Sequence, residues 1–289
     1  MKTIGIISNN EKQKALEVAK DIYDRLSLKK VEVLLPEEDY FPTKYSLPSV
    51  SRKIFSSRSG IILSVGGDGT FLRAAKYSFD NEIPVLGINV GNLGFLTEIE
   101  TSNISQTLDG LISGDYHLEK RMLLEGILFK QGRRVKDTGL PDLALNEFAI
   151  TRSMSEKVIR MEIIVNDVSI KKLTADGIII ATPTGSTAYS LSAGGPVVEP
   201  QAESIIITPI CPHTLFSRSI ILGQDKELKV KLSSGNKRDM LSIDGKTAAL
   251  EDPSEYILRV TRAKKDLNLV SFNPNAFFKV FKEKFIERI

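Results

Sequence analysis

Three glycines surround one carboxylate in residues 66–70, which read Gly-Gly-Asp-Gly-Thr. The string follows the apolar run 61–65 and precedes a helical pattern, so it lies where a strand passes into a helix. Glycine lets the backbone approach a phosphate, and N–H groups at a helix start attract the anion. Asp68 would repel a bare phosphate, so its presence needs a functional reason. It could accept a proton, or it could hold a metal ion that binds the phosphates. A tight turn with Asp68 as helix cap is the structural alternative. The residues expected to form the phosphate turn are Gly66, Gly67 and Thr70.

Two further polar segments lie next to apolar runs. Residues 87–97 are rich in glycine but lack the spacing Gly-x-Gly-x-x-Gly, so the dinucleotide fingerprint of dehydrogenases is absent. A turn with Phe95 in the core is the alternative for this segment. Asn146 and Glu147 lie inside the strand-like run 143–152, where an amide beside a carboxylate suits an adenine edge or ribose hydroxyls. An exposed strand face explains one of these two side chains at most, because successive side chains point to opposite faces.

The longest polar segment covers residues 174–196. A buried strand leads there into a hydroxyl-rich loop and a short helix. The Ser and Thr hydroxyls, the free N–H groups and the ring of Tyr189 can bind a nucleoside and a diphosphate together. A capped helix start would account for one or two of the hydroxyls and not for five. The segment therefore predicts a nucleotide-binding loop.

The first third of the chain alternates short apolar runs with helical patterns. This alternation predicts a doubly wound α/β domain, in which ligands bind at the carboxyl ends of the strands. The expected strands are residues 3–8, 31–35, 61–65 and 84–88, and the expected helices are residues 12–26 and 70–77. Residues 36–48 hold three prolines and are expected to form a surface loop.

The pattern changes after about residue 118, where strand-like runs follow one another closely. Asn166 and Asp167 form a hairpin signal between two of these runs. The spacing predicts a mainly β, sandwich-like second domain. Residues 275–286 return to a helical pattern with phenylalanines on one face, and we expect this C-terminal helix to return to the first domain and pack on it. The expected domains are residues 1–118, 119–268 and 269–289.

Composition excludes several classes of function. A net charge of +3 over 289 residues, with Lys and Arg spread along the chain, favours neither a nucleic acid nor a membrane as partner. Cys211 is the only cysteine and there are two histidines, so we expect no disulfide and no Cys/His metal site. The first apolar run is too short for a signal peptide, and no run reaches membrane-spanning length. These features predict a cytoplasmic protein.

The four polar segments together resemble those of the NAD kinase family. The resemblance covers nearly the whole chain, from residues 66–70 through Asn146 and Glu147 to residues 174–196 and 242–245. The Gly-Gly-Asp-Gly-Thr string alone is shared with diacylglycerol and sphingosine kinases and loosely with phosphofructokinases. Residues 174–196 are far more specific. Like the family, the chain has no Walker-A loop.

The resemblance implies a role for each matching residue. Asp68 matches the catalytic aspartate of the family, and Asn146 and Glu147 match the pair that binds the adenosine part of the ligand. Thr174 stands where relatives often carry a basic residue. The further residues that the resemblance places beside the nucleotide or NAD are Gly69, Arg73, Lys157, Thr174, Asp176, Thr187, Ala188, Tyr189, Ser190, Leu191, Ser192 and Lys246.

The implied reaction transfers the γ-phosphoryl group of ATP to the 2′-hydroxyl of the adenosine ribose of NAD and yields NADP. Asp68 would orient that hydroxyl and take its proton, and Mg²⁺ would hold the phosphates of ATP, with no metal fixed by protein ligands alone. NAD or NADH as acceptor, and ATP or polyphosphate as donor, stay open. The family usually forms homodimers or homotetramers.

Two rival functions share part of these features. A lipid kinase of the diacylglycerol or sphingosine type would keep the glycine turn but needs an apolar lipid pocket or a membrane-binding surface. A non-catalytic dinucleotide-binding regulator would keep Asn146, Glu147 and Tyr189 and has no need of Asp68 in a phosphate turn. Formation of NADP separates the three functions.

Overall fold

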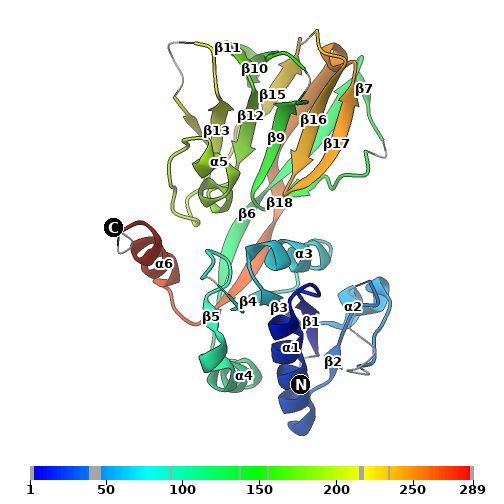
Figure 1. Cartoon of the computed structure of the whole chain (residues 1–289), viewed down its shortest axis with the longest axis vertical. Helices are drawn as coiled ribbons and strands as arrows, with labels where there is room; N and C mark the ends of the chain where they lie inside the picture. The colour runs from blue at the N-terminus through cyan, green and yellow to red at the C-terminus, as the bar shows by residue number, and fades with distance from the viewer. Residues whose placement is uncertain are drawn as a thin grey trace. The chain divides into compact units, whose positions relative to one another are not determined.

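The computed structural model describes residues 3–38, 47–91, 93–136, 138–154, 156–214, 218–233 and 235–286. The expected loop 36–48 falls mostly outside this set, as does Asn92 of the second polar segment. The chain forms two compact units: unit 1 comprises Met1–Lys120 with Asp266–Ile289, and unit 2 comprises Arg121–Lys265 (Figure 1). Two long strands, β6 (His117–Lys130) and β18 (Tyr256–Ser271), have residues in both units.

Unit 1 is built on a parallel sheet. Its other elements are β1 (Ile4–Ser8), α1 (Gln13–Leu28), β2 (Val33–Leu34), α2 (Arg52–Arg58), β3 (Ile61–Gly66), α3 (Asp68–Ser78), β4 (Val85–Asn89), β5 (Ile99–Glu100), η2 (Thr101–Asn103), α4 (Ile104–Ser113) and α6 (Ala276–Phe285). The strands lie in the order β18–β4–β3–β1–β2, with β5 also paired to β4, and all these pairings are parallel. Every residue of β1, β3 and β4 is buried, as expected of strands covered on both faces.

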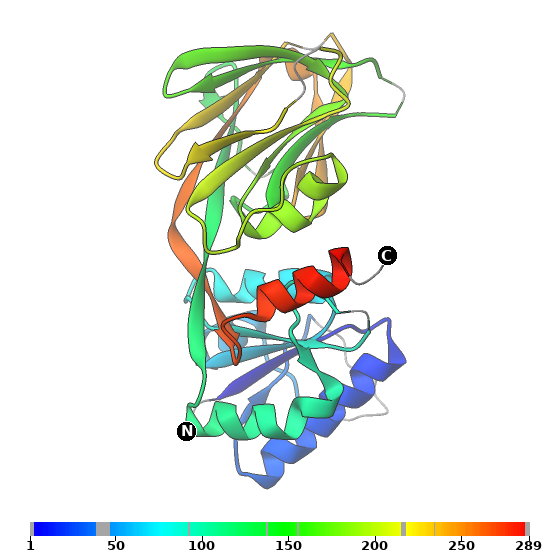
Figure 2. The ribbon, with the colours of Figure 1, turned by 90° about the vertical axis from the view of Figure 1, so that its left-hand side faces the viewer.

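Helices cover both faces of this sheet (Figure 2). Successive side chains of β1 point to opposite faces. Ile6 belongs to a buried cluster that includes Ala15 of α1 and Leu108 of α4. Gly5 faces the other side, where a Cβ would lie 2.5 Å from the ring of Phe55 in α2. The predicted doubly wound α/β architecture is therefore confirmed.

Helix α6 belongs to unit 1 and carries an aromatic cluster. The rings of Phe277 and Phe285 lie 6.0 and 6.1 Å from the ring of Phe95, which follows β4. Phe95 is itself only half-buried, so the alternative that places it in the core is wrong. Val280 is the buried side chain of α6, whereas Phe278 is 54% exposed and is not a core residue.

Unit 2 is a sandwich of two sheets. Its remaining elements are β7 (Arg133–Arg134), β8 (Leu143–Ala144), β9 (Glu147–Arg152), β10 (Ile159–Val165), β11 (Val168–Ala175), β12 (Gly177–Ala181), η3 (Thr184–Thr187), α5 (Tyr189–Ser192), β13 (Ser204–Ile210), β14 (Ile220–Gly223), β15 (Leu228–Leu232), β16 (Arg238–Ile243), β17 (Lys246–Glu251) and η4 (Pro253–Glu255). One sheet has the order β14–β13–β12–β9–β16–β17, and the other joins β11, β10, β15 and β18 with β6.

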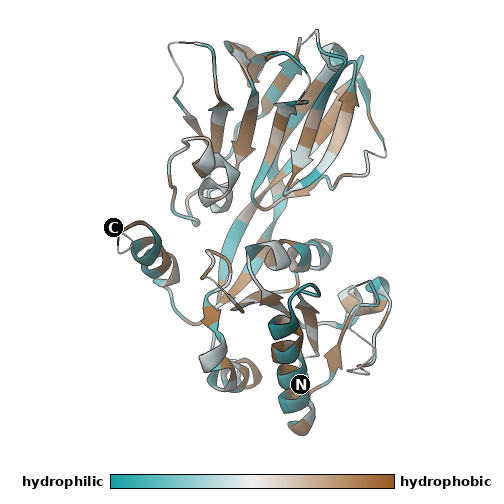
Figure 3. Cartoon of the chain, viewed as in Figure 1, coloured by the Kyte–Doolittle hydropathy of each residue, from teal (hydrophilic) through white to brown (hydrophobic). Residues whose placement is uncertain are grey.

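A buried cluster in unit 2 draws side chains from both sheets. Phe148 and Ile180 come from the first sheet, and Met161 and Val230 come from the second. Figure 3 shows hydrophobic and hydrophilic residues following one another along these strands, as expected of strands with one face on the core. The predicted mainly β second domain is confirmed.

Two predicted elements of unit 2 have different outcomes. The hairpin turn between β10 and β11 is confirmed, because Asn166 and Asp167 both adopt left-handed angles, with φ of 46° and 64°. The strand predicted over residues 143–152 is interrupted, since Asn146 lies between β8 and β9. Across both units, none of the helices that the structure describes combines the length and the apolar character needed to span a bilayer.

Candidate functional site

The glycine turn joins β3 to α3 in unit 1. Helix α3 begins at Asp68 with Gly67 as its N-cap, two residues earlier than the sequence predicts, so Asp68 is not the cap. The N–H groups of Thr70 and Phe71 donate to the carbonyl of Gly67, at 2.9 and 3.1 Å. Because those two donors are used, the N–H groups left for an anion at the helix start are those of Asp68 and Gly69.

Two glycines of this turn border open space. No described atom lies within 4 Å of the position that a Cβ would take at Gly67 or at Gly69. At Gly66 a Cβ would lie 2.4 Å from the hydroxyl of Thr70, so Gly66 serves the packing of the turn. The backbone at Gly67 and Gly69 is therefore open to close approach by a phosphate.

The carboxylate of Asp68 is held by the loop that follows β4. The backbone N–H of Phe95 donates to its Oδ2 at 3.0 Å, and that of Leu96 donates to its Oδ1 at 3.1 Å. The hydroxyl of Thr97 lies 3.4 Å from Oδ1. A Cβ at Gly94 would lie 2.0 Å from the same oxygen, so only glycine lets the carboxylate pack there. The second polar segment thus positions Asp68, a role for which its only sequence signal is its glycine content.

The turn lies at the carboxyl edge of the parallel sheet. The register pairs Ser8 of β1 with Val65 of β3, and Gly66 of β3 with Asn89 of β4. Arg73 donates from Nη2 to the carbonyl of Ser8 at 2.6 Å, which brings its guanidinium to the same edge. This is the edge at which open α/β sheets bind their ligands.

In unit 2, the turn that holds Asn146 and Glu147 is fixed by Asp244. The Asp244 carboxylate accepts the backbone N–H groups of residues 145, 146 and 147 at 2.8, 2.8 and 3.1 Å. Asp244 and Gly245 form the hairpin turn between β16 and β17, with left-handed φ angles of 45° and 78°. These contacts take the N–H groups out of strand pairing and interrupt the predicted strand.

The loop after β12 holds the same turn from its other side. The N–H of Thr182 donates to the carbonyl of Asn146 at 2.9 Å, and its hydroxyl donates to the carbonyl of Leu145 at 2.5 Å. Gly185 packs so closely on this turn that a Cβ would lie 2.1 Å from the carbonyl oxygen of Asn146. The backbone at Asn146 is therefore held by two separate loops.

Several predicted nucleotide contacts come together in unit 2. Asn146 and Glu147 are 8% and 7% exposed. Burial raises the pKa of Glu147 to about 8, repulsion by Asp244 raises it as well, and the backbone N–H of Tyr189 lowers it. Tyr189 is 41% exposed. Glu147 and Tyr189 thus form a partly enclosed polar cluster, and the buried Asn146 precedes Glu147 in the chain.

Asp176 joins this cluster through its charge. Burial and then the charges of Cys211, Glu147 and Asp176 raise the pKa of Tyr189. The Asp176 carboxylate accepts a hydrogen bond from Nε of Arg152 at 2.8 Å, which raises the pKa of that guanidinium. Asp176 therefore lies near Tyr189 with its own negative charge already paired.

Some of the hydroxyls in residues 174–196 form hydrogen bonds within the protein, although the sequence predicts that they bind a nucleotide. Ser190 is fully buried, and its Oγ lies 2.9 Å from the hydroxyl of Thr208. Ser186 donates to the carbonyl of Val198 and accepts the N–H of the same residue. Short polar side chains bind nearby backbone readily, so a hydroxyl-rich loop can use them to hold its own shape. The hydroxyls of Ser186 and Ser190 are thus engaged inside the protein.

The remaining predicted contacts have varied positions in unit 2. Lys157 and Lys246 are exposed. Thr174 is half-buried in β11, where its carbonyl accepts the N–H of His213. Near α5, Ser192 is exposed, and the half-buried residues are Thr187, Ala188 and Leu191.

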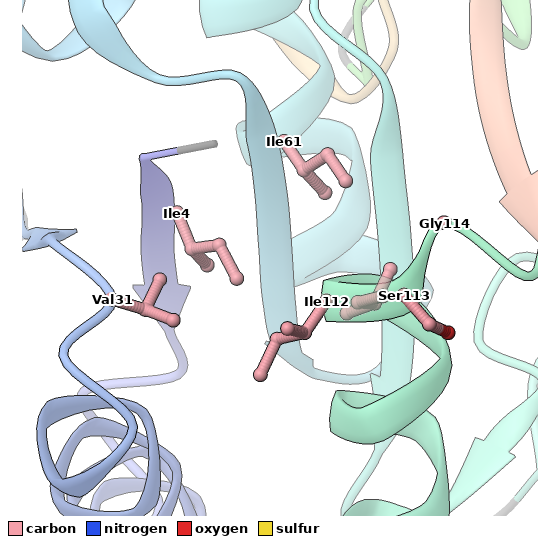
Figure 4. A pocket seen from close by; sticks show the side chains of 7 residues that line it. Ile4, Val31, Ile61, Ile112, Ser113 and Gly114 are labelled. Atoms are coloured by element: carbon pink, nitrogen blue, oxygen red, sulfur yellow. The ribbon is translucent and has the colours of Figure 1, made fainter. Parts of the chain in front are cut away.

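A hollow of about 400 Å³ lies at the opposite edge of the unit 1 sheet (Figure 4). Ile4 and Ile61, the first residues of β1 and β3, line it together with Ile112 of α4. This apolar lining offers no titratable side chain. Among the residues that the structure describes, no group of three or more His, Cys, Asp or Glu side chains is placed to hold a metal ion.

A held carboxylate in a glycine turn at the carboxyl edge of a parallel sheet is typical of a nucleotide-binding enzyme, and the comparisons with known proteins agree. The family model of the ATP-NAD kinase N-terminal domain matches residues 4–116, and that of the C-terminal domain matches residues 145–272. An NAD kinase of Moorella thermoacetica is 37% identical over 288 residues, which covers 99% of this chain and 90% of that protein. An NAD kinase of Caldanaerobacter subterraneus subsp. tengcongensis is 38% identical and covers 100% of both chains. The chain therefore belongs to the NAD kinase family, and the resemblance seen in the sequence is confirmed.

Solved structures share the same fold. The crystal structure of yeast NADH kinase complexed with NADH has a TM-score of 0.88 at 24% identity, covering 98% of this chain and 87% of that chain. The crystal structure of an NAD kinase from Archaeoglobus fulgidus in complex with ATP has a TM-score of 0.75 at 25% identity, covering 98% of both chains. An α/β domain followed by a mainly β domain is thus the architecture that this chain shares with NAD and NADH kinases.

Proposed function

We propose that this chain is an NAD kinase, which transfers the γ-phosphoryl group of ATP to the 2′-hydroxyl of the adenosine ribose of NAD and so makes NADP. The observation that carries this proposal is the Asp68 carboxylate, held by three donors at a glycine turn. Membership of the family supports it, because relatives that match the full chain are NAD kinases. The relative from Archaeoglobus fulgidus was solved with ATP, which supports ATP as the donor.

Asp68 is the residue proposed to receive the proton of the 2′-hydroxyl. Phosphoryl transfer passes through a loose transition state, so positioning and charge neutralisation dominate the catalysis. The bonds from Phe95 and Leu96 fix the direction of both carboxylate oxygens. Oδ1 already accepts from Leu96 and Thr97, whereas Oδ2 accepts from Phe95, so Oδ2 keeps an acceptor site for the hydroxyl proton.

The phosphates of ATP are proposed to lie on the glycine turn. The open space at Gly67 and Gly69 and the N–H groups at the start of α3 suit them. Gly66 and Thr70 shape the turn, and Arg73 at the same sheet edge would balance negative charge.

A magnesium ion is proposed to reach this site with the nucleotide. Mg²⁺ is usually bound through one or two carboxylates together with substrate phosphates rather than by an all-protein cage. The turn offers such a setting, because the carboxylate of Asp68 lies at the start of α3, beside the N–H groups proposed to hold the phosphates. When bound, the ion would neutralise charge on the transferring phosphoryl group.

The polar cluster of unit 2 is proposed to bind NAD. The buried amide of Asn146 and carboxyl of Glu147 can bond the adenosine part, and the half-exposed ring of Tyr189 can stack on a base. Asp176 would contribute a paired carboxylate beside them. The hydroxyl of Ser190 is engaged by Thr208, so only the backbone of Ser190 is proposed to face the ligand. Further proposed contacts are Lys157, Thr174, Thr187, Ala188, Leu191, Ser192 and Lys246.

The setting of the enzyme is also a proposal. We propose that it supplies NADP in the cytoplasm and assembles as a homodimer or homotetramer. The exposed free thiol of Cys211 suits a reducing compartment, and the assembly rests on the family resemblance. Light scattering on the purified chain tests the assembly, which a stable monomer would contradict.

A coupled assay tests the proposed activity. The protein is mixed with NAD, ATP and Mg²⁺, and NADP is detected with an NADP-specific dehydrogenase. Steady formation of NADP is expected, and parallel reactions with NADH or polyphosphate define the acceptor and donor range. Absence of NADP with every donor would overturn the proposal and return the lipid kinase and the non-catalytic regulator to consideration.

A further inference from the structure

Two carboxyl groups share one buried turn in unit 2. Glu147 and Asp244 are each 7% exposed. The N–H of Glu147 donates to Oδ1 of Asp244 at 3.1 Å, and the N–H of Asp244 donates to the carbonyl of Glu147 at 3.2 Å. Two like charges in such a place repel each other strongly, so one of the two groups tends to keep its proton.

The hydrogen bonds decide which group carries the charge. Asp244 accepts three backbone N–H groups, from residues 145, 146 and 147, and such donors stabilise an ionised carboxylate. Oε2 of Glu147 is buried and has no hydrogen-bond partner among the described residues. An ionised Glu147 would leave that oxygen unpaired in a site of low dielectric constant, which costs more than a neutral acid does.

Among the described residues, the titratable groups that act on Glu147 are Asp244, from the turn between β16 and β17, and Tyr189, from α5. Neither of them carries a positive charge. The backbone N–H of Tyr189 is the one group here that favours the ionised form, and burial outweighs it.

We propose that Asp244 is a positioning residue of the dinucleotide site: as an anion it fixes the turn at residues 145–147, and it thereby leaves Glu147 as a neutral acid that donates a hydrogen bond to the ligand. This rests on the proposed function of unit 2 in binding NAD. Oε2 of Glu147 has no partner among the described residues, so an acceptor atom of the ligand can take the O–H of the neutral acid. A neutral group also avoids repelling a ligand that carries two phosphates. The direction of the pKa of Glu147, raised to about 8, agrees with this assignment.

Titration of Glu147 in the ligand-free protein tests the assignment. Glutamate carrying ¹³C in its side-chain carboxyl is incorporated, and the Glu147 signal is identified by its absence in Glu147→Gln. The expected midpoint is about 8, as burial and Asp244 predict. In Asp244→Asn the midpoint moves down, because a like charge has been removed.

The matched control is Asp252→Asn. Asp252 is an exposed turn residue of the same unit with a similar left-handed φ of 51°, so this variant repeats the chemical change away from Glu147. It is expected to leave the midpoint unchanged. A wild-type midpoint near the ordinary 4.5 would overturn the proposal, and so would an unchanged midpoint in Asp244→Asn. If Asp244→Asn does not fold, the wild-type titration still decides the protonation state of Glu147.

Calorimetric titration with NAD between about pH 6 and pH 9 tests the consequence for binding. Affinity is expected to fall above about pH 8, by up to about tenfold per pH unit, because the ligand prefers the protonated form. Glu147→Gln is permanently neutral and should bind NAD with little dependence on pH. A flat wild-type profile with tight binding would overturn the donor role. Failure to bind NAD at any pH would count against the proposed function instead, while the carboxyl titration would still report on Glu147.

Discussion

Both units hold a carboxylate with backbone N–H groups from another part of the chain, but they use it in opposite ways. In unit 1 the held group is Asp68, the residue proposed to act on the substrate, and the loop after β4 holds it. In unit 2 the held group is Asp244, and the contact serves to fix the turn that carries Glu147. One carboxylate is oriented by its N–H donors, and the other orients the backbone that supplies them.

This difference leaves the two proposed functional carboxyls in different states. Both oxygens of Asp68 have donors, so its direction is set before any ligand arrives. Glu147 keeps an oxygen with no partner in the described protein. A buried group without a partner has a free-energy cost that a ligand can remove. Unit 1 therefore holds a carboxylate that is oriented in advance, and unit 2 holds a carboxyl group that a ligand can still satisfy.

The largest expected effect comes from removing the charge of Asp68. Asp68→Asn loses the proposed proton acceptor, which typically contributes about 10²–10⁴-fold in rate. Its amide nitrogen would also have to face Phe95 or Leu96, whose N–H groups now donate to the two oxygens. Turnover in the coupled assay should fall by about that factor. NAD should still bind, because most of the proposed dinucleotide contacts lie in unit 2.

The matched control for this substitution is Asp115→Asn, which makes the same change at an exposed position of unit 1. It should retain normal turnover. Near-normal turnover in Asp68→Asn would show that Asp68 is not the proton acceptor. The proposed difference between the two held carboxylates would then be wrong.

The second effect comes from the residue that packs on Asp68. A Cβ at Gly94 would lie 2.0 Å from Oδ1 of Asp68, so Gly94→Ala must displace the carboxylate or its loop. A misplacement of about 1 Å can cost about 10²-fold in rate, and we expect a loss of kcat of about that size with little change in NAD affinity. Gly91→Ala, in the same loop, meets no described atom within 4 Å and serves as the control. Equal kcat in both variants would show that the loop does not position Asp68.

A third effect concerns the free energy of unfolding, and it tests whether folding raises the pKa of Glu147. The pKa of Glu147 is raised from 4.5 to about 8 by folding, so the folded state binds this proton more tightly than the unfolded state. Its contribution to stability is therefore present below about pH 4.5 and is lost as pH rises towards about 8, by about 1.4 kcal/mol per pH unit. The difference in stability between wild type and Glu147→Gln, measured by thermal unfolding from about pH 5 to pH 8, should follow this slope. A pH-independent difference would contradict the raised pKa.

The smallest effect is expected at Thr97, whose hydroxyl lies 3.4 Å from Oδ1 of Asp68. Thr97→Val keeps the shape and removes this long hydrogen bond, so kcat should fall by about two- to fivefold. Thr97→Ser keeps the hydroxyl and should restore most of the activity. If Val and Ser variants lose activity equally, the methyl group matters and the hydroxyl does not.

Much of the fold and part of the site could be predicted from local sequence. The alternation of strand and helix predicted the α/β domain, and closely spaced strands with the Asn166–Asp167 turn predicted the β-rich domain. The string at residues 66–70 predicted a turn between a strand and a helix, and the longer segments identified the family. Such features depend on residue types within a few positions of one another, which is the range over which a sequence pattern carries structural information.

Only the tertiary structure decided what holds the two carboxyls. The donors to Asp68 lie 27 to 29 residues further along the chain, and Asp244 lies 97 to 99 residues beyond the turn that it fixes. The distance to Asp244 explains why the sequence predicts Asn146 inside a strand. Thr208, which binds the hydroxyl of Ser190, is likewise 18 residues away, so the sequence pattern places that hydroxyl towards a ligand. The sequence shows which chemical group each residue carries, but the packing of distant segments determines which group it bonds to. The sequence by itself therefore identified the family and the residues whose types could bind or react. The fold decided which of them are held in one orientation, which lack a hydrogen-bond partner, and which bond to other parts of the protein.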